Sequence, residues 1–397
     1  MLDVATARAR ILAAFSPLPA EIVALEQARG RILAEPVSAR RDQPPAAVSA
    51  MDGYAVRAAD AGSDDWLEVV GEVAAGRPLE LGIGRAQAAR IFTGGLVPEG
   101  ADAILIQENA EVAGNRVRAT ESLRSGQFVR PQGLDYRAGW VGLEPGTRIG
   151  PLEIGLAASL GSAWLSVRRK PRVGLIATGD ELRLPGGTLA PHEIASSNSF
   201  MLRAMLEAWG AVPVDLGIAQ DTPADLAAKF EAARGLDLLV TSGGASVGDH
   251  DLVRRVGGEQ GLDLDFWKIR MRPGKPLIFG RLGETPLLGL PGNPVSAAVC
   301  GIVFLRGAVR VMLGLDPALP TTTAKLARDI PAGIDREDYQ RARRDGAGRI
   351  LPAERQDSSM LATLARADVL LVRPPSAPAL EAESEVTVID LERVLAD

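Results

Sequence analysis

The chain has very few of the residues on which several enzyme classes depend. Its 397 residues include one cysteine and two histidines. A single cysteine excludes internal disulfides and clusters of thiolate ligands. Two histidines argue against a zinc enzyme or a Ser-His-Asp hydrolase. The sequence therefore predicts a reducing compartment and chemistry that does not depend on thiolate or imidazole.

Excess basic charge and long apolar runs are also missing. The formal net charge of −6 argues against nucleic acid or an anionic membrane as a general partner. The longest apolar stretch, 295–305, ends at Arg306 and is shorter than the roughly 20 residues that span a membrane. The first residues carry charges at Asp3, Arg8 and Arg10 and do not resemble a secretory signal. We expect a cytoplasmic protein with no membrane segment.

The first half of the chain predicts a discontinuous domain. Residues 1–46 have helical spacing, including a second amphipathic run over 20–33, and 152–165 return to that spacing. Between them, short β-like runs separated by glycine, proline and asparagine turns predict a β-rich unit. We expect a helical N-terminal domain at 1–46 and 146–170, interrupted by an inserted β-rich domain at 47–145.

The second half predicts two further domains. Strand and helix patterns alternate through 171–317, which favours a doubly wound, mostly parallel sheet. From 318 to 397 the runs are β-like again, with one short helical segment at 358–365, and predict a C-terminal β-barrel-like domain. The expected fold class is therefore α/β and multidomain.

Three predicted strands of the 171–317 domain end in polar, glycine-containing turns: TGDE (178–181), SGGASVGDHD (242–251) and PGNP (291–294). Ligands of open parallel sheets bind at the carboxyl ends of the strands. Gly243 and Gly244 allow backbone N–H groups to converge, and Ser242 and Ser246 add hydroxyls. An ordinary tight turn is the alternative for this segment. The acids that follow, Asp249 and Asp251, suit a hard cation, although Asp251 could instead cap the next helix.

Basic residues near the third turn would complete an anion site. The PGNP turn opens a helix, whose free N–H groups favour an oxyanion, although Asn293 could simply cap that helix. Lys268, Arg272 and Lys275 lie in FWKIRMRPGKP, a segment with a rigid Pro-Gly pair. Solvated surface charge is the alternative for these cations.

Motifs along nearly the whole chain carry a family resemblance. TGDEL (178–182), SGGASVGDHD (242–251), MRPGKPLIFG (271–280) and PGNPVSA (291–297) are similar to the motif set of the molybdopterin molybdenumtransferases, the bacterial MoeA family related to the gephyrin E domain. SAMDGYA (49–55), FTGGLVPEGADAI (92–104), GLDYRAG (133–139) and QDSSML (356–361) resemble further motifs of that family.

The resemblance implies an activity and an assembly. Members of the family insert molybdenum from molybdate into adenylylated molybdopterin (molybdopterin-AMP) and release AMP, with Mg²⁺ or another divalent cation. The resemblance also implies a homodimer with its active site at the subunit interface, and contacts with other proteins of molybdenum cofactor biosynthesis. Two alternatives are a molybdopterin adenylyltransferase, which the sheet domain alone resembles, and a non-catalytic gephyrin-like scaffold. The additional motifs outside the sheet domain favour the transferase.

The site residues follow by resemblance, position by position. Asp52 and Asp135 are expected to act across the subunit interface, although Asp52-Gly53 is also a common turn pair. Arg341 could also belong to a solvated charge run with Arg343 and Arg344. Arg272 stands where the family has lysine, and a planar guanidinium is not equivalent to an ammonium group. The implied catalytic residues are Asp52, Thr93, Asp135, Glu181, Asp249, Lys268 and Lys275, with Glu181 and Asp249 as metal ligands; the implied substrate-binding residues are Gly179, Asp180, Asp221, Ser242, Gly243, Gly244, Ser246, Arg272, Pro291, Gly292, Asn293, Arg341 and Ser358.

Overall fold

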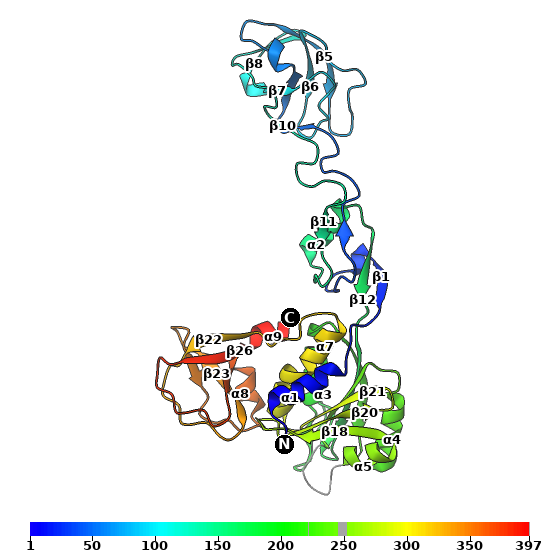
Figure 1. Cartoon of the computed structure of the whole chain (residues 1–397), viewed down its shortest axis with the longest axis vertical. Coiled ribbons are helices and arrows are strands. Elements are labelled where there is room, and N and C mark those ends of the chain that lie inside the picture. The colour runs from blue at the N-terminus through cyan, green and yellow to red at the C-terminus, as the bar shows by residue number, and fades with distance from the viewer. Residues whose placement is uncertain (221, 245–251, 397) are drawn as a thin grey trace. The chain divides into compact units, whose positions relative to one another are not determined.

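The structure, a computed structural model, describes residues 1–220, 222–244 and 252–396 (Figure 1). It divides into two compact units. One comprises Met1–Glu21, Gly30–Ala34 and Ser166–Asp397, and the other comprises Ile22–Arg29 and Glu35–Leu165. The finer division into domains at residues 46, 145, 170 and 317 remains a prediction.

The unit formed by Ile22–Arg29 and Glu35–Leu165 contains a six-stranded sheet with the order β7-β4-β6-β5-β9-β8. Only the β5 and β6 pair is parallel. Short apolar side chains fill its core, including Ala55, Ala88 and Ala89. The strands are β4 (Gly53–Val56), β5 (Leu67–Val73), β6 (Gln87–Ile91), β7 (Ala103–Ile106), β8 (Ala110–Ala113) and β9 (Arg116–Ala119). The smaller elements are η1 (Leu25–Gln27), β2 (Val37–Ser38), β3 (Val48–Ser49), η2 (Ala58–Asp60), η3 (Gln107–Asn109), β10 (Val129–Arg130), β11 (Val141–Leu143) and α2 (Pro151–Ser159); β10 pairs with β3 and β11 with β2.

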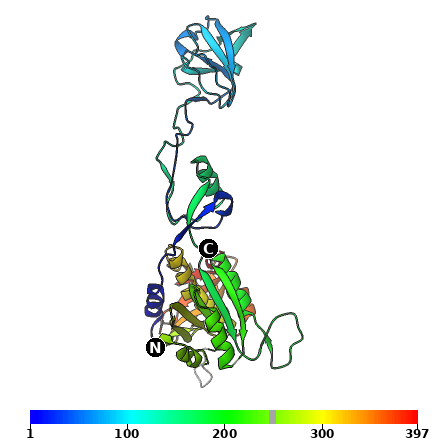
Figure 2. The same ribbon diagram turned by 90° about the vertical axis from the view of Figure 1, so that its right-hand side faces the viewer.

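The central sheet of the other unit confirms the predicted α/β fold. Its order is β16-β13-β17-β21-β20-β18, with the first four strands parallel and the last two antiparallel to their neighbours. Strands and helices of this unit are seen from two sides in Figures 1 and 2. The strands are β13 (Arg172–Thr178), β16 (Val212–Ala219), β17 (Leu238–Ser242), β18 (Leu262–Lys268), β20 (Pro276–Leu282) and β21 (Thr285–Leu290). The helices are α1 (Val4–Ala13), α3 (Asn198–Ala208), α4 (Pro223–Ala232), α5 (Leu252–Glu259), α6 (Pro294–Cys300) and α7 (Arg306–Met312), with a π-helical segment η4 (Gly301–Leu305) between the last two. The chain also contains the short strands β1 (Ala20–Ala24), β12 (Trp164–Arg168), β14 (Leu182–Arg183) and β15 (Ile194–Ala195).

The central strands are apolar on both faces because helices cover both sides. Along β17, Leu238 and Val240 pack toward α3, α6, η4 and α7, whereas Leu239 packs toward α4 and α5. Such continuous apolar runs are typical of parallel strands buried on both faces. The period-two alternation of the strand thus divides its side chains between two separate cores.

The segment α6–η4–α7 forms one continuous helical stretch, Pro294–Met312. By length and composition alone it could cross a membrane, but 89% of its most apolar window is buried within this unit. It is the core helix of the domain, and Val295, Val299 and Val303 are fully buried against the sheet.

The C-terminal segment forms a second sheet with the order β19-β23-β25-β26-β22, and β24 pairs with β23. β19 comes from the α/β part of the chain and pairs in parallel with β23. A small core including Leu326, Ile350 and Val388 lies on this sheet. The elements are β19 (Met271–Arg272), β22 (Thr321–Lys325), β23 (Glu337–Arg344), β24 (Ile350–Pro352), α8 (Leu361–Ala365), β25 (Val369–Arg373), β26 (Glu385–Asp390) and α9 (Leu391–Ala396).

Two local expectations differ from the structure. The run at 20–33 was predicted as a helix, but it contains strand β1 and the short 3₁₀ turn η1. Its apolar residues alternate too briefly to distinguish the helical from the extended period, and pairing with β12 selects the strand. β23, with the sequence EDYQRARR, was not expected to be a strand because most of its residues are charged or polar, yet it lies inside the C-terminal sheet.

Candidate active site

The three glycine-containing turns lie side by side. They follow β13, β17 and β21, which are consecutive neighbours in the sheet, so their carboxyl ends meet at one edge. A cavity of about 1030 Å³ opens there. Its walls include all three turns, the segment 271–276 and the loop 356–359 of the C-terminal segment. The sequence prediction that these turns form one site is therefore supported by their placement in the fold.

The second turn requires glycine at two positions. Gly243 and Gly244 have φ values of +97° and +63°, a region that strains other residues. A Cβ on Gly243 would overlap the carbonyl oxygen of Thr178 and lie 2.9 Å from its hydroxyl oxygen. A Cβ on Gly244 would lie 2.8 Å from the same hydroxyl oxygen. The turn after β17 thus packs its backbone directly on the end of β13.

Two asparagines connect the walls of the cavity. Asn198, at the start of α3, donates from Nδ2 to Ser242 Oγ at 2.8 Å and to the carbonyl oxygen of Gly292 at 2.7 Å, which links the second and third turns. Asn293 donates from Nδ2 to Ser358 Oγ at 2.8 Å, and the Val295 N–H donates to the Ser358 carbonyl at 3.1 Å. The C-terminal segment therefore completes the cavity rather than merely flanking it.

The basic segment contributes unequally to the cavity. Arg272 and Lys275 line it. Lys268 is not among the lining residues, and its ammonium nitrogen lies 3.5 Å from the ring centroid of Trp267. Gly274 brings the loop against the core, because a Cβ there would lie 2.5 Å from Cys300 Sγ. The predicted cations are thus divided between the cavity and a cation–π contact.

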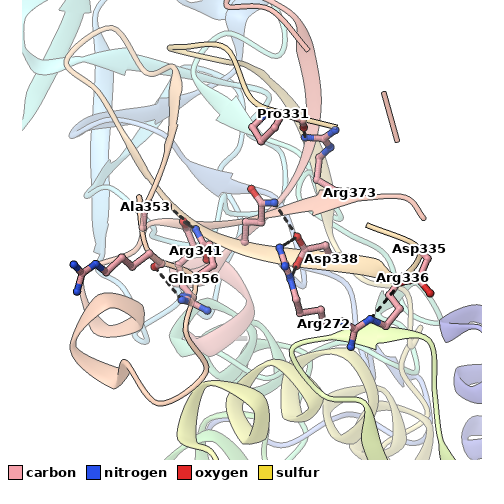
Figure 3. Close-up of polar contacts among 11 residues, drawn as sticks. Arg272, Pro331, Asp335, Arg336, Asp338, Arg341, Ala353, Gln356 and Arg373 are labelled. Atoms are coloured by element: carbon pink, nitrogen blue, oxygen red, sulfur yellow. Dashed lines mark hydrogen bonds and ion pairs between the residues drawn. The ribbon is translucent and has the colours of Figure 1, made fainter. Parts of the chain in front are cut away.

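A cluster of arginines around one carboxylate lies beside the cavity (Figure 3). Arg272 donates from Nε to Asp338 Oδ1 at 2.8 Å and from Nη2 to Asp338 Oδ2, a two-pronged ion pair. Arg341 is 1% exposed, and its Nη2 donates to the carbonyl oxygens of Arg355 and Asp357 at 3.2 and 3.1 Å. Burial lowers the pKa of Arg341, while the charge of Asp338 raises it. Arg341 is therefore a buried cation of the C-terminal sheet and not part of a solvated charge run.

The loop 356–359 has its own hydrogen bonds. The hydroxyl and N–H of Ser359 donate to Asp357 Oδ1 at 2.6 and 2.8 Å, and these bonds lower the pKa of Asp357. Gln356 donates from Nε2 to the carbonyl oxygen of Arg341 at 2.9 Å, and its Oε1 accepts from the Arg341 N–H at 3.0 Å. These contacts place Ser358 at the cavity next to Asn293.

The other unit contains two predicted residues in direct contact. Thr93 donates from its backbone N–H and from its hydroxyl to Asp52 Oδ1, at 2.7 and 2.9 Å. These two bonds, the backbone one first, lower the pKa of Asp52. The Asp135 side chain is exposed, and its N–H donates to the carbonyl of Gln43 at 2.9 Å. Asp52 is therefore an ionised carboxylate held in a defined orientation and not only part of a turn.

The cavity brings together most of the residues predicted for the α/β domain. Asp180 and Arg341 do not line it, and neither does Lys268. Asp221, Ser246 and Asp249 lie outside the described residues. Among the described residues no group of three or more metal-binding side chains occurs, and Glu181 is the predicted metal ligand that reaches the cavity. The predicted residues on its walls are Gly179, Glu181, Ser242, Gly243, Gly244, Arg272, Lys275, Pro291, Gly292, Asn293 and Ser358.

Several residues in or beside the site were not predicted from the sequence, and three of them make contacts that shape it. Asn198 and Gln356 line the cavity, and Asp338 pairs with Arg272 next to it. Asn198 is the first residue of α3, where a polar side chain is common, so nothing distinguished it. Asp338 lies in a charged segment whose burial depends on its strand pairing, which no local pattern indicates.

Comparison with known proteins agrees with this architecture over the whole chain. Family models match at three places: the MoeA N-terminal region (domain I and II) over residues 2–161, a probable molybdopterin binding domain over 174–311, and the MoeA C-terminal region (domain IV) over 323–391. A solved structure of the molybdopterin biosynthesis MoeA protein from Pyrococcus horikoshii is similar with a TM-score of 0.88 and 29% identity, covering 98% of this chain and 99% of that one.

Curated relatives are similar at the level of sequence. Molybdopterin molybdenumtransferase 2 of Mycobacterium tuberculosis is 37% identical over 384 residues, covering 93% of this chain and 94% of the relative. The molybdopterin molybdenumtransferase of Haemophilus influenzae is 35% identical over 346 residues, covering 86% and 85%. Because the matches span nearly the full length of both chains, the protein belongs to the MoeA family of molybdopterin molybdenumtransferases.

Proposed function

We propose that this enzyme inserts molybdenum from molybdate into adenylylated molybdopterin, with cleavage of the adenylate and release of AMP. The observation that carries the proposal is the convergence of three glycine-containing turns, Lys275 and Arg272 on one cavity in a chain of this family. Its volume, about 1030 Å³, is at the upper end of the range of roughly 300–1,000 Å³ typical of small-molecule sites. A substrate that joins a pterin to a nucleotide requires a site of this size.

The charges of the substrate explain the chemistry of the walls. Phosphate groups and molybdate are anionic, and a protein of net charge −6 can hold them only with locally placed donors. The turn at Gly243 and Gly244 brings backbone to the cavity wall, and the turn at Pro291–Asn293 opens the helical stretch Pro294–Met312, whose N-terminal N–H groups favour an anion. Lys275 adds a flexible ammonium group on the same cavity. We assign the phosphates to these turns.

We assign the molybdate oxyanion to the opposite wall, near Ser358 and Arg272. Arg341 supports this assignment, because its buried Nε and Nη1 have no hydrogen-bond partner among the described residues. A buried guanidinium with free N–H groups is costly unless an anion or water satisfies it. Its Nη2 is already bound to the carbonyl of Asp357, next to Ser358. The guanidinium group of Arg341, with Nε and Nη1 unpaired in the described part of the chain, is therefore bonded to the loop that carries Ser358.

A divalent cation such as Mg²⁺ fits the donor type of the cavity. Glu181 offers a carboxylate on its wall, and hard cations prefer such oxygen ligands together with substrate phosphates. When bound, the cation would neutralise phosphate charge during cleavage of the phosphoanhydride. Asp249, the second proposed ligand, lies outside the described residues. Glu181 is therefore the residue of this chain on which the proposal can be tested.

Asp52, Thr93 and Asp135 have a separate place in the proposal. We propose that they act on substrate bound to the other subunit of a homodimer, which works in the cytoplasm with other molybdenum cofactor biosynthesis proteins. The support is the Asp52 carboxylate, which two hydrogen bonds from Thr93 hold in a fixed orientation and whose pKa they lower. Sedimentation of the purified chain tests the dimer.

The activity is tested with two mixtures of purified protein. One contains adenylylated molybdopterin and molybdate with Mg²⁺, and the other contains molybdopterin and ATP. We expect AMP release and cofactor competent to activate a molybdenum-free apoenzyme only in the first mixture. Adenylylated molybdopterin and pyrophosphate from the second mixture, with no AMP from the first, would instead identify an adenylyltransferase. No product from either mixture would favour a non-catalytic scaffold.

A further inference from the structure

The basic segment of the cavity is built into the C-terminal sheet. Strand β19 pairs in parallel with β23, with Met271 opposite Glu337 and Arg272 opposite Asp338. The Glu337 N–H also donates to the carbonyl of Arg270 at 3.1 Å. The segment that carries Arg272 is therefore fixed by backbone pairing to the strand that carries Asp338.

Asp338 is a buried carboxylate that uses both oxygens. Its side chain is 3% exposed, whereas that of Arg272 is 37% exposed. Oδ1 accepts from Arg272 Nε, and Oδ2 accepts from Arg272 Nη2 and, at 2.8 Å, from Gln340 Nε2 (Figure 3). A guanidinium held at two nitrogens cannot rotate freely, so Asp338 sets the direction in which Arg272 points.

The same carboxylate faces two further arginines. Arg373 lies opposite Asp338 in the pairing of β23 with β25 and is 2% exposed. Burial lowers the pKa values of Arg341 and Arg373, and the charge of Asp338 raises both. Asp338 is thus bonded to Arg272 and interacts by charge with Arg341 and Arg373, whose guanidinium groups donate to backbone carbonyl oxygens (Figure 3).

The geometry leaves part of Arg272 available to a ligand. Nε and Nη2 are engaged by Asp338, while Nη1 has no hydrogen bond to any described residue. Arg272 lines the cavity and Asp338 does not. A lysine at position 272 could not reproduce this arrangement, because an ammonium group lacks the fork that binds a carboxylate on one side and leaves donors on the other.

We propose that Asp338 is a positioning residue, which holds the guanidinium of Arg272 so that its free nitrogen faces an oxyanion in the cavity. The inference rests on the proposed function, since it assigns that oxyanion to molybdate. Asp338 does not touch the oxyanion itself. It reduces the conformational freedom that Arg272 would otherwise lose when the anion binds.

The sign of one effect separates this role from simple charge balance. Replacing Asp338 with asparagine removes one negative charge near the cavity, so the local net charge becomes more positive by one. Charge alone would then tighten molybdate binding. Loss of positioning would weaken it, because asparagine can accept only one of the two guanidinium bonds and Arg272 regains its rotamers.

The experiment measures molybdate binding by calorimetry and AMP release by steady-state kinetics in Asp338→Asn. We expect about 3- to 10-fold weaker molybdate binding, in line with the cost of ordering one long side chain, and a fall in kcat/KM for molybdate of at least that size. Asp338→Glu, which keeps the two-oxygen acceptor, should recover part of both. Asp263→Asn removes an exposed carboxylate of β18 that does not line the cavity and is the control, with both quantities expected to stay within about 2-fold.

A second variant keeps the test valid if Asp338→Asn folds poorly. Arg272→Lys alters the more exposed partner, and it should weaken molybdate binding to a similar extent. Adding Asp338→Asn to Arg272→Lys should then cost little more, since both changes remove one interaction. Additive losses, tighter molybdate binding in Asp338→Asn, or a lower Tm with unchanged affinity would each overturn the inference.

The two proposals can fail separately. If the wild-type chain binds molybdate but releases no AMP from adenylylated molybdopterin, the proposed reaction is wrong, and the calorimetric comparison still decides the role of Asp338. If turnover occurs and Asp338→Asn matches the wild type in both measurements, only the positioning role is wrong. A wild-type chain that binds no molybdate would overturn both.

Discussion

The two walls of the cavity to which we assign the anions are built by different means. The wall from the α/β domain consists largely of the backbone of turns that contain Gly243, Gly244 and Gly292, and Asn198 links two of these turns by hydrogen bonds. The wall from the C-terminal segment depends on charged side chains, with Arg272 held by Asp338 and with Arg341 buried behind the loop. A backbone wall is sensitive to shape, whereas a side-chain wall is sensitive to charge and to the partners that orient it.

The largest effect is expected from adding one methyl group to the backbone wall. Gly243→Ala places a Cβ at a φ of +97° and against the carbonyl oxygen of Thr178. We expect a loss of about 2–4 kcal/mol in the free energy of unfolding, from left-handed strain together with steric overlap. Chemical denaturation measures the loss, and AMP release should fall with it because the turn can no longer close on β13.

Gly235→Ala is the matched control for that substitution. Gly235 also has a positive φ, +78°, and precedes the same strand, but a Cβ there would meet no atom within 4 Å. We expect a loss of about 1 kcal/mol from the backbone conformation alone. Equal losses in the two variants would show that the contact with Thr178 is unimportant and that the backbone wall tolerates volume.

The next largest effect should come from removing a single cation from the cavity, that of Lys275. Lys275→Gln keeps much of the side-chain length and removes the cation from the cavity. We expect kcat/KM for adenylylated molybdopterin to fall by about 10²–10³, the range for losing one donor to a developing oxyanion. Steady-state AMP release provides the measurement. Lys325→Gln, which removes an ammonium paired with Glu383 in the C-terminal sheet, should leave the rate unchanged.

A smaller effect is expected where the walls meet. Asn293→Ala and Ser358→Ala each remove the 2.8 Å bond between Asn293 Nδ2 and Ser358 Oγ. We expect each to lower turnover by about 10-fold, and a double-mutant cycle to give a coupling energy of about 0.5–1.5 kcal/mol. A coupling energy near zero would mean that the two walls act independently, and the comparison between them would then describe two sites instead of one.

The smallest effect should be a pH dependence outside the cavity. Bonds from the Thr93 N–H and hydroxyl lower the pKa of Asp52 in the folded protein. A lowered folded pKa stabilises the fold above the unfolded value, near 3.9, and that stabilisation disappears as the pH falls through the folded value. Asp52→Asn should therefore slightly reduce the unfolding free energy at pH 7 and have less effect in acid.

Thr93→Val tests which bond is responsible. The substitution removes the hydroxyl bond to Asp52 and keeps the backbone N–H bond, so the pH-dependent difference should shrink without disappearing. Chemical denaturation at several pH values provides the measurement for both variants. A difference that grows in acid would contradict the assigned sign.

The backbone wall could be predicted from the sequence because its residues follow local rules. An apolar strand run that ends in Ser242-Gly243-Gly244 or in Pro291-Gly292 predicts a turn at a strand end, and parallel order brings such ends together. In the structure, residues of these turns line one cavity. The Asn198 bridge was the exception, because an asparagine at the start of a helix has the same local pattern whether or not it links two turns.

The side-chain wall could not be predicted in the same way. The segment EDYQRARR has no apolar alternation, so a solvated charge run was an open alternative for Arg341, but the segment is strand β23 inside the C-terminal sheet. Asp338 and Arg341 are buried there because partners distant in the sequence satisfy them. Arg341 and Ser358 were named only through family resemblance. Residues whose environment is set by long-range pairing need the fold before their role can be inferred.

The pairing of β19 with β23 also limits how the chain can be divided. A fragment that ends near residue 317 would contain the whole central sheet and the three glycine-containing turns. It would still lack the strand against which Met271 and Arg272 are held, together with the loop that receives Asn293. The α/β domain is thus an incomplete module: transplanted alone, it would carry the three glycine-containing turns without the wall to which we assign molybdate.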